Sequence, residues 1–144
     1  MATRETATRG LGLRAAFLVV AAEVLLRTRD TSVALRLLAR PRSSARGVDP
    51  VRALAEVQRV GRVARSRCLT QSVALTALLV RHGRDAELVL GCHRYAPGEW
   101  GAHAWVDCGG EVLEPVPAGP HDELARCAAR HRWVPAAVGP TATE

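Results

Sequence analysis

Two residues of this chain combine side-chain types and surroundings that could support acyl transfer. Cys68 opens the segment CLTQSVALTALLVRHG, and His103 follows 35 residues later in AHAWVDCGGEVLEP. The first segment predicts a helix that begins at the cysteine, and the second predicts a β-hairpin that carries the histidine. Free backbone N–H groups at a helix N-terminus stabilise a thiolate, and an imidazole beside it can take up the thiol proton. The pair is therefore a candidate nucleophile and general base.

A third group normally orients the imidazole in such a pair. The candidates are Asp107, Glu111 and Glu114. The Gly-Gly turn at 109–110 predicts a hairpin in which residue 108 lies opposite 111, and residue 105 opposite 114. Glu114 then shares a face with His103 and lies diagonally to it, whereas Glu111 points to the other face. Asp107 lies four residues along the same strand, about 13 Å away. We therefore select Glu114 as the third catalytic residue, with Asp107 as the second choice.

Four helices are expected ahead of this hairpin, over residues 12–28, 31–40, 50–65 and 68–82. Asp49 has the side chain of an N-cap, and Pro50 fits the first helical position. The last of the four helices is apolar nearly all round, so we expect it to be central and buried, with Gly83 ending it. Gln71, one turn into that helix, is expected to be solvated or to cap it.

Three strands are expected after the helices, over residues 86–92, 102–108 and 111–115, and the tail is expected to form a short helix near 121–131. A turn-rich loop is expected at 94–101. Residues 1–10 are polar and are expected to be disordered. The rest, 11–144, is expected to form one domain, with a helical part (11–66), a catalytic core (67–116) and a C-terminal tail (117–144). The predicted class is α+β, with the central helix packed on a small antiparallel sheet.

Composition excludes several classes of function. The net charge is +6, carried by scattered arginines without a basic run, so we do not expect nucleic-acid binding. The four cysteines form no CxxC pair and no zinc-site spacing, which favours reduced thiols, a cytoplasmic protein and no metal. The apolar segment 15–26 is too short to span a bilayer, which takes about 20 residues. The lysine-free composition is typical of a high-GC bacterial genome.

Residues 50–116 resemble the stand-alone leader peptidases of lasso-peptide biosynthesis, which are cysteine proteases of the transglutaminase-like, papain-related superfamily. The resemblance is carried by CLTQSVALTALLVRHGRDAELVLG followed by AHAWV and a short hairpin. It implies that Cys68 is the nucleophile and His103 the general base and acid. The family generally has an acidic residue, often Asp, at the end of the next strand, where this chain has Pro115 with Glu114 beside it.

The resemblance implies a function as well as a site. It predicts removal of the leader from a ribosomally made precursor peptide, without a metal or organic cofactor. It also implies a separate small leader-recognition protein and a cyclase that closes a macrolactam on the freed N-terminus. Two alternatives stay open, namely another transglutaminase-like amidase or acyltransferase, and a catalytically silent binding module with the same fold.

Overall fold

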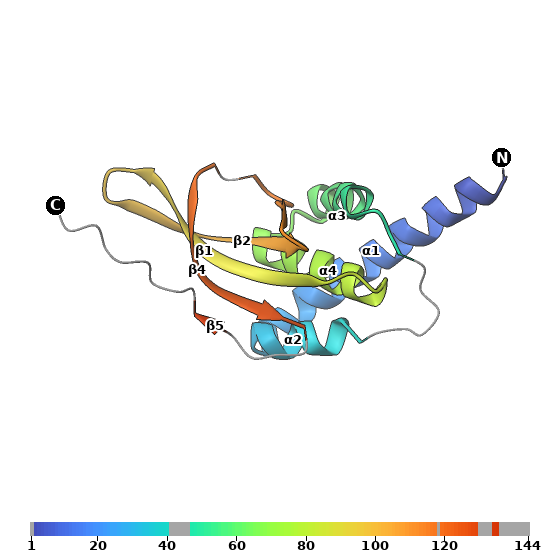
Figure 1. Cartoon of the computed structure of the whole chain (residues 1–144), viewed down its shortest axis with the longest axis horizontal. Coiled ribbons are helices and arrows are strands. Elements are labelled where there is room, and N and C mark those ends of the chain that lie inside the picture. The colour runs from blue at the N-terminus through green and yellow to red at the C-terminus, as the bar shows by residue number, and fades with distance from the viewer. Residues whose placement is uncertain (1, 41–46, 118, 130–133, 136–144) are drawn as a thin grey trace.

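The computed structural model describes residues 2–40, 47–117, 119–129 and 134–135 of the chain. Within this part, four helices pack on one five-stranded antiparallel sheet of order β3-β2-β1-β4-β5 (Figure 1). The helices are α1 (Ala2–Thr28), α2 (Thr31–Leu38), α3 (Pro50–Ala64) and α4 (Cys68–Arg81). The strands are β1 (Ala86–Ala96), β2 (Glu99–Cys108), β3 (Glu111–Leu113), β4 (His121–Ala128) and β5 (Val134–Pro135). The α+β class is confirmed.

The first two helices differ from expectation mainly at their ends. We expected residues 1–10 to be disordered, whereas α1 begins at Ala2. Each residue added to an existing helix gains one hydrogen bond, and five of the eight residues 2–9 are Ala, Arg or Glu, which favour helix. Helix α2 ends at Leu38, and Asp30 precedes it as N-cap without a side-chain cap bond. Part of the expected loop, residues 41–46, lies outside the described residues.

Helix α3 begins where its capping residues predict. Asp49 has an extended backbone, and its Oδ1 accepts a hydrogen bond from Val51 N (3.3 Å), with Pro50 at the start of the helix. The buried face repeats every fourth residue, at Ala53, Val57 and Gly61. This spacing turns one stripe of α3 toward the core.

Helix α4 is the centre of the molecule, as its sequence predicts. Every residue from 70 to 79 is buried, and the helix packs against α1, α2, α3, β1 and β2. Leu75, Leu78 and Leu79 are fully buried, and each such side chain stabilises the fold by about 1.5–3 kcal/mol. Gly83 follows the helix with φ +76°, as expected of the glycine that ends it.

Gln71 is not solvated. Its side chain is buried, its Nε2 donates to Ser66 O (2.9 Å), and a Cβ added at Gly61 would overlap its amide. The amide thus satisfies the backbone carbonyl of Ser66, in the segment that leads into α4, which agrees with the capping alternative.

The sheet is larger than the sequence predicted. Residues 94–101 are not a loop, because β1 and β2 continue through them to a tight turn at Pro97-Gly98, where Gly98 has φ +82°. The β2–β3 register is the predicted one, since Cys108 lies opposite Glu111 and Val106 opposite Leu113. Gly109 and Gly110 both have positive φ, which is what a two-residue turn of this kind requires.

The predicted tail helix is wrong. Residues 121–128 form β4, which pairs with β1 from Glu87↔Ala128 to His93↔His121. The sequence HDELARCA lacks β-branched and aromatic residues, but pairing with a buried central strand outweighs local preference. The remaining residues of that expected helix include 130 and 131, which lie outside the described part.

Candidate active site

The N-terminus of α4 presents free backbone donors beside a thiol. The helix begins at Cys68, and its N-cap Arg67 has an extended backbone and makes no side-chain cap bond. Ser72, one turn later on the same side of the helix, donates its Oγ proton to Ala104 O of β2 (2.9 Å). Cys68 is half-buried and lies about 6 Å nearer the helix start, so it also faces the β2 side.

His103 lies in a buried contact with the predicted acid. Only 4% of the imidazole-bearing residue is exposed, and its Nε2 lies 3.7 Å from Oε1 of Glu114. Its ring stacks on that of Trp105 with centroids 5.7 Å apart. Burial lowers the pKa of His103, and the nearby Glu114 carboxylate only partly opposes this, so the ring is neutral at neutral pH. The structure thus brings His103 and Glu114 together, as the hairpin register predicts.

A third ionisable side chain, His121 of β4, joins this pair and was missed by sequence reasoning. Its Nδ1 lies 3.2 Å from Oε1 of Glu114 and 2.7 Å from Gly119 O, to which it donates. Its ring lies against Trp105, with centroids 4.1 Å apart. The separation of His121 from His103 along the sequence does not indicate that the two residues are neighbours. A strand prediction for residues 121–128 would have placed His121 on the sheet.

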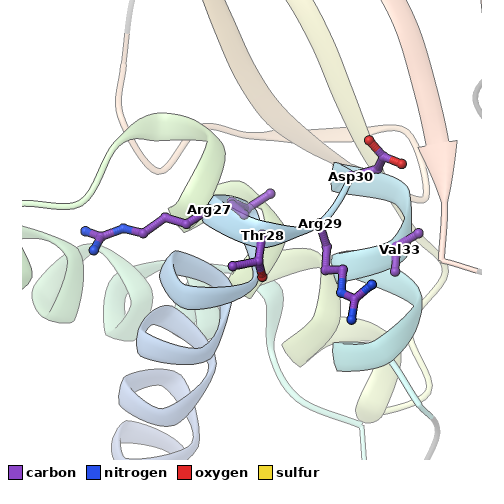
Figure 2. A pocket seen from close by; sticks show the side chains of 6 residues that line it. Arg27, Thr28, Arg29, Asp30 and Val33 are labelled. Carbon is purple, nitrogen blue, oxygen red and sulfur yellow. The ribbon is translucent and has the colours of Figure 1, made fainter.

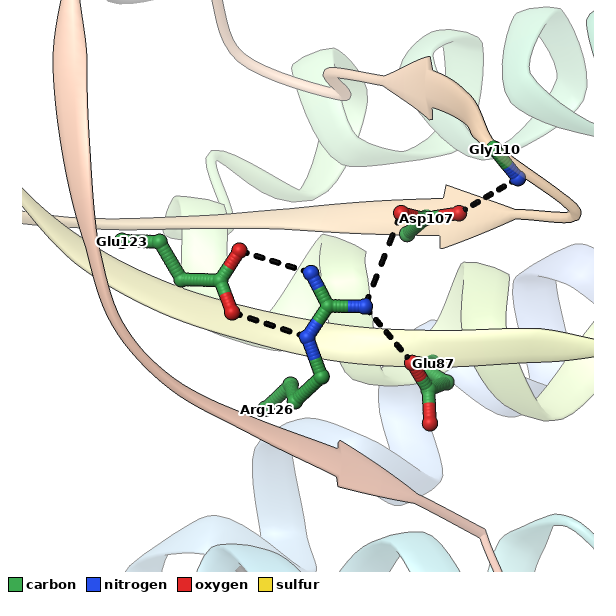
Figure 3. Close-up of polar contacts among 5 residues, drawn as sticks. All are labelled: Glu87, Asp107, Gly110, Glu123 and Arg126. Atoms are coloured by element: carbon green, nitrogen blue, oxygen red, sulfur yellow. Dashed lines mark hydrogen bonds and ion pairs between the residues drawn. The ribbon is translucent and has the colours of Figure 1, made fainter. Parts of the chain in front are cut away.

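Asp107, the second choice for the acid, is engaged elsewhere (Figure 3). Its Oδ1 accepts from Gly110 N (2.8 Å), and its Oδ2 lies 3.7 Å from Nη1 of Arg126. Arg126 also makes a two-bond contact with Glu123 (2.8 and 2.7 Å) and one bond with Glu87 (2.9 Å). The hydrogen bonds of Arg126 to Glu123 and Glu87 raise the pKa of the arginine and keep it charged. Asp107 therefore belongs to an ion-pair network that links β1, β2 and β4.

Cys68 and His103 are not joined by a hydrogen bond in the described part of the chain. Side chains alternate along β2, and Ala104 and Val106 belong to the core cluster that includes α4. The His103 ring instead points to the face that carries Trp105 and His121. Helix α3 borders the acid from the other side, since Gln58 Nε2 donates to Glu114 O (3.3 Å).

Two surface hollows are lined by described residues of α1. One, of about 440 Å³, lies at the turn into α2 and is lined by Leu26, Arg27, Thr28, Arg29, Asp30 and Val33 (Figure 2). It contains no candidate site residue. The other, of about 140 Å³, is lined by Val19, Val20, Glu23, Val24, Arg27, Ala64 and Ser66, and so borders the entry to α4.

Glu23 ties this second hollow to the first turn of α4. Its Oε2 accepts from Thr70 Oγ1 (2.8 Å). This hydrogen bond lowers the pKa of Glu23, and the charges of Arg27 and Arg67 act in the same direction. The contact fixes α1 against the helix start that carries Cys68.

A protein-family model describing the transglutaminase-like superfamily matches residues 15–135, a segment that contains Cys68, His103 and Glu114. The chain belongs to the transglutaminase-like superfamily. That superfamily includes cysteine proteases, and membership indicates cysteine protease or acyltransferase-type activity in general. Comparison with curated proteins and with solved structures gives no match. Among the described residues, no helix is both long and apolar enough to cross a membrane.

Proposed function

We propose that this protein is a cysteine peptidase that removes the leader from a ribosomally synthesised lasso-peptide precursor. Cys68 is the nucleophile, His103 the general base and acid, and Glu114 the group that orients the imidazole. The observation that carries the proposal is the contact between His103 Nε2 and Glu114 Oε1, in a superfamily member whose central helix begins at a cysteine. With Nε2 toward the acid, Nδ1 of His103 is left to exchange a proton with the thiol.

The reaction runs through a thioester. His103 takes the proton from Sγ of Cys68, and the thiolate attacks the scissile carbonyl carbon to form a tetrahedral oxyanion. The uncapped N–H of Cys68 at the start of α4 donates to that oxyanion. Collapse breaks the C–N bond as His103 protonates the leaving amine. Water, deprotonated by His103, then hydrolyses the thioester and restores the thiol.

The proposal requires the His103 ring, which points to the face of the sheet that carries Trp105 and His121, to turn within hydrogen-bond reach of Cys68 when the precursor binds. Catalytic hydrogen bonds in substrate-free enzymes are often long and tighten only in the substrate complex. Proton exchange between the two side chains is therefore the step to test first.

Thiol alkylation tests that step without a substrate. If His103 activates Cys68, iodoacetamide modifies Cys68 at neutral pH, and His103→Gln slows this by at least about tenfold, in line with the 10²–10⁴-fold typical of general-base catalysis. Cys92, a half-buried thiol on β1, is the matched control, and its labelling rate should not change. Equal labelling of Cys68 in both proteins would refute the pair.

Leader removal itself is tested with a candidate precursor peptide, with and without a leader-recognition protein. Mass spectrometry should show separate leader and core fragments for the wild-type protein, and intact precursor for Cys68→Ala. Glu114→Gln should lower the rate substantially, whereas Asp107→Asn should not, because Asp107 is bound by Arg126. Cleavage by Cys68→Ala would overturn the assignment.

The partners form part of the proposal. A separate leader-recognition protein delivers the precursor, and a cyclase acts on the released core. Exposed apolar side chains spaced along α1, at Leu13, Phe17, Val20 and Val24, offer such a partner a surface. We place the protein in the cytoplasm, because four cysteines without a CxxC pair are too few for a disulfide framework in a chain of this length.

A second candidate is an amidase or acyltransferase that uses the same residues on another substrate. Superfamily membership supports it equally well. Labelling of Cys68 that depends on His103, together with no cleavage of any precursor, would favour this alternative. A Cys68 that does not react with iodoacetamide would favour a catalytically silent binding module.

A further inference from the structure

The cluster of His103, Glu114 and His121 has the composition of a metal site. One ligand atom from each side chain lies within 4.8 Å of the other two, and the three come from β2, the segment after β3, and β4. Two imidazoles and one carboxylate are a common protein ligand set for zinc, with a fourth position open to water. Mg²⁺ and Ca²⁺ prefer oxygen ligands throughout, so the set selects for zinc and similar transition metals.

An independent observation concerns a buried nitrogen. Among the described residues, Nε2 of His103 is a buried side-chain nitrogen without a hydrogen-bond partner. Leaving such an atom unpaired costs about 1–3 kcal/mol. Oε1 of Glu114 lies 3.7 Å from it, which is too long for a hydrogen bond. Two ligands of a tetrahedral zinc ion, each at about 2.0–2.1 Å, lie about 3.3 Å apart, so a small closure suffices.

The surroundings of His121 also suit a ligand. Its ring is held by the bond from Nδ1 to Gly119 O (2.7 Å) and by contact with Trp105. Metal-binding histidines usually donate their other ring N–H to a carbonyl or carboxylate, so with Nδ1 bonded to Gly119 O, Nε2 of His121 is the nitrogen left for the metal. Gln58 in turn donates to Glu114 O and fixes the backbone of the third ligand.

We propose that His103, Glu114 and His121 bind one Zn²⁺ ion. Zinc binding is independent of the proposed function, whereas the effect of zinc on catalysis rests on that function. His103 and Glu114 are also the proposed base and acid, and an imidazole bound to zinc through Nε2 no longer has Glu114 as its orienting partner. Zinc therefore inhibits the reaction of Cys68 reversibly, and a chelator restores it.

Binding is measured by competition with a chromophoric zinc chelator, on the full chain and on Cys68→Ala, in which the proposed nucleophile is removed. Both should bind one zinc ion per chain. Glu114→Gln and His121→Gln should each weaken binding by at least tenfold. His82→Gln, which removes a histidine at the end of α4, is the matched control and should bind zinc as the wild type does. Co²⁺ bound to Cys68→Ala should give visible ligand-field bands without a thiolate charge-transfer band.

Two outcomes would overturn the proposal. One is wild-type affinity in both His121→Gln and Glu114→Gln, and the other is a thiolate band in the Co²⁺ spectrum, which would assign the metal to cysteines. Circular dichroism of the metal-free variants checks that each is folded. If His121→Gln is not folded, Glu114→Gln and the Co²⁺ spectrum still decide. Zinc binding without any peptidase activity would leave this proposal standing and remove the proposed function, whereas activity without zinc binding would do the reverse.

Discussion

Replacing Arg126 by methionine should destabilise the fold, because this one side chain joins three strands. Its guanidinium makes two bonds to Glu123, one to Glu87 and a longer contact to Asp107. These side chains are between 23% and 36% exposed, so solvent screens each pair. Partly exposed ion pairs contribute about 0.2–1 kcal/mol each, and removal of the cation also leaves three carboxylates near one another. We expect a loss of about 2 kcal/mol at pH 7 and low salt.

The assay is thermal unfolding followed by circular dichroism. For a domain of this size, about 2 kcal/mol corresponds to a Tm lower by roughly 6 °C. Arg62→Met, which removes an exposed arginine of α3, is the matched control and should shift Tm by far less. The difference should shrink in about 1 M salt, where the Debye length falls to about 3 Å.

The pH dependence gives the sharper test. The hydrogen bond from Arg126 lowers the pKa of Glu123 in the folded state. The unfolded chain therefore binds this proton more readily, and the stabilisation is present above pH 4.5 and is lost as the pH falls through the lowered pKa. The Tm difference between wild type and Arg126→Met should accordingly narrow as the pH falls from 4.5 toward 3. A difference that stays constant from pH 7 to pH 3 would show that Arg126 acts through packing and not through charge.

Three further changes test the packing around the site. Burial lowers the pKa of His103 below 6.5, so the unfolded state binds more protons, and the free energy of unfolding should fall as the pH drops below 6.5. His103→Gln should flatten this pH dependence, and an equal slope in both proteins would contradict the prediction. Gly91→Ala places a Cβ 2.2 Å from Asp122 O and 2.6 Å from the Trp105 ring, so the free energy of unfolding, measured by urea titration, should fall by about 1–3 kcal/mol. Gly10→Ala is the control, because its Cβ would have nothing within 4 Å, and it should not destabilise the fold. Glu23→Gln should remove stability that is present above pH 4.5 and is lost as the pH falls through the lowered pKa of Glu23; a Tm difference that persists at pH 3 would mean that its charge is not responsible.

The helical half of the fold and the β2–β3 hairpin could be predicted because their signals are local. A capping aspartate with a following proline starts α3, and the apolar run of α4 requires burial on all sides. Two consecutive glycines fix the hairpin register, and that register alone placed Glu114 beside His103 and excluded Glu111.

The other half of the sheet could not be predicted, because its signals are not local. Strand β4 has the composition of a helix and becomes a strand only through its pairing with β1. The same error concealed Arg126 and His121, since residues of an expected tail helix have no predictable neighbours on the sheet. The ends of β1 and β2 were missed for a related reason: Pro97-Gly98 is a two-residue turn within a stretch rich in turn-forming residues.

The β1–β4 pairing also decides which chemistry is available to Glu114. Its register shifts between Leu90 and Gly91, so that Leu90 lies opposite Ala125 but Gly91 lies opposite Glu123. Because side chains alternate along a strand, this one extra residue turns the start of β4 over and places His121 opposite His93, on the same face as His103. Without the shift, His121 would point to the face occupied by α4, and Glu114 would have only His103 as an imidazole neighbour. The bulge thus converts a carboxylate that orients one histidine into one shared by two, which is the difference between a proton-transfer pair and a metal-binding cluster.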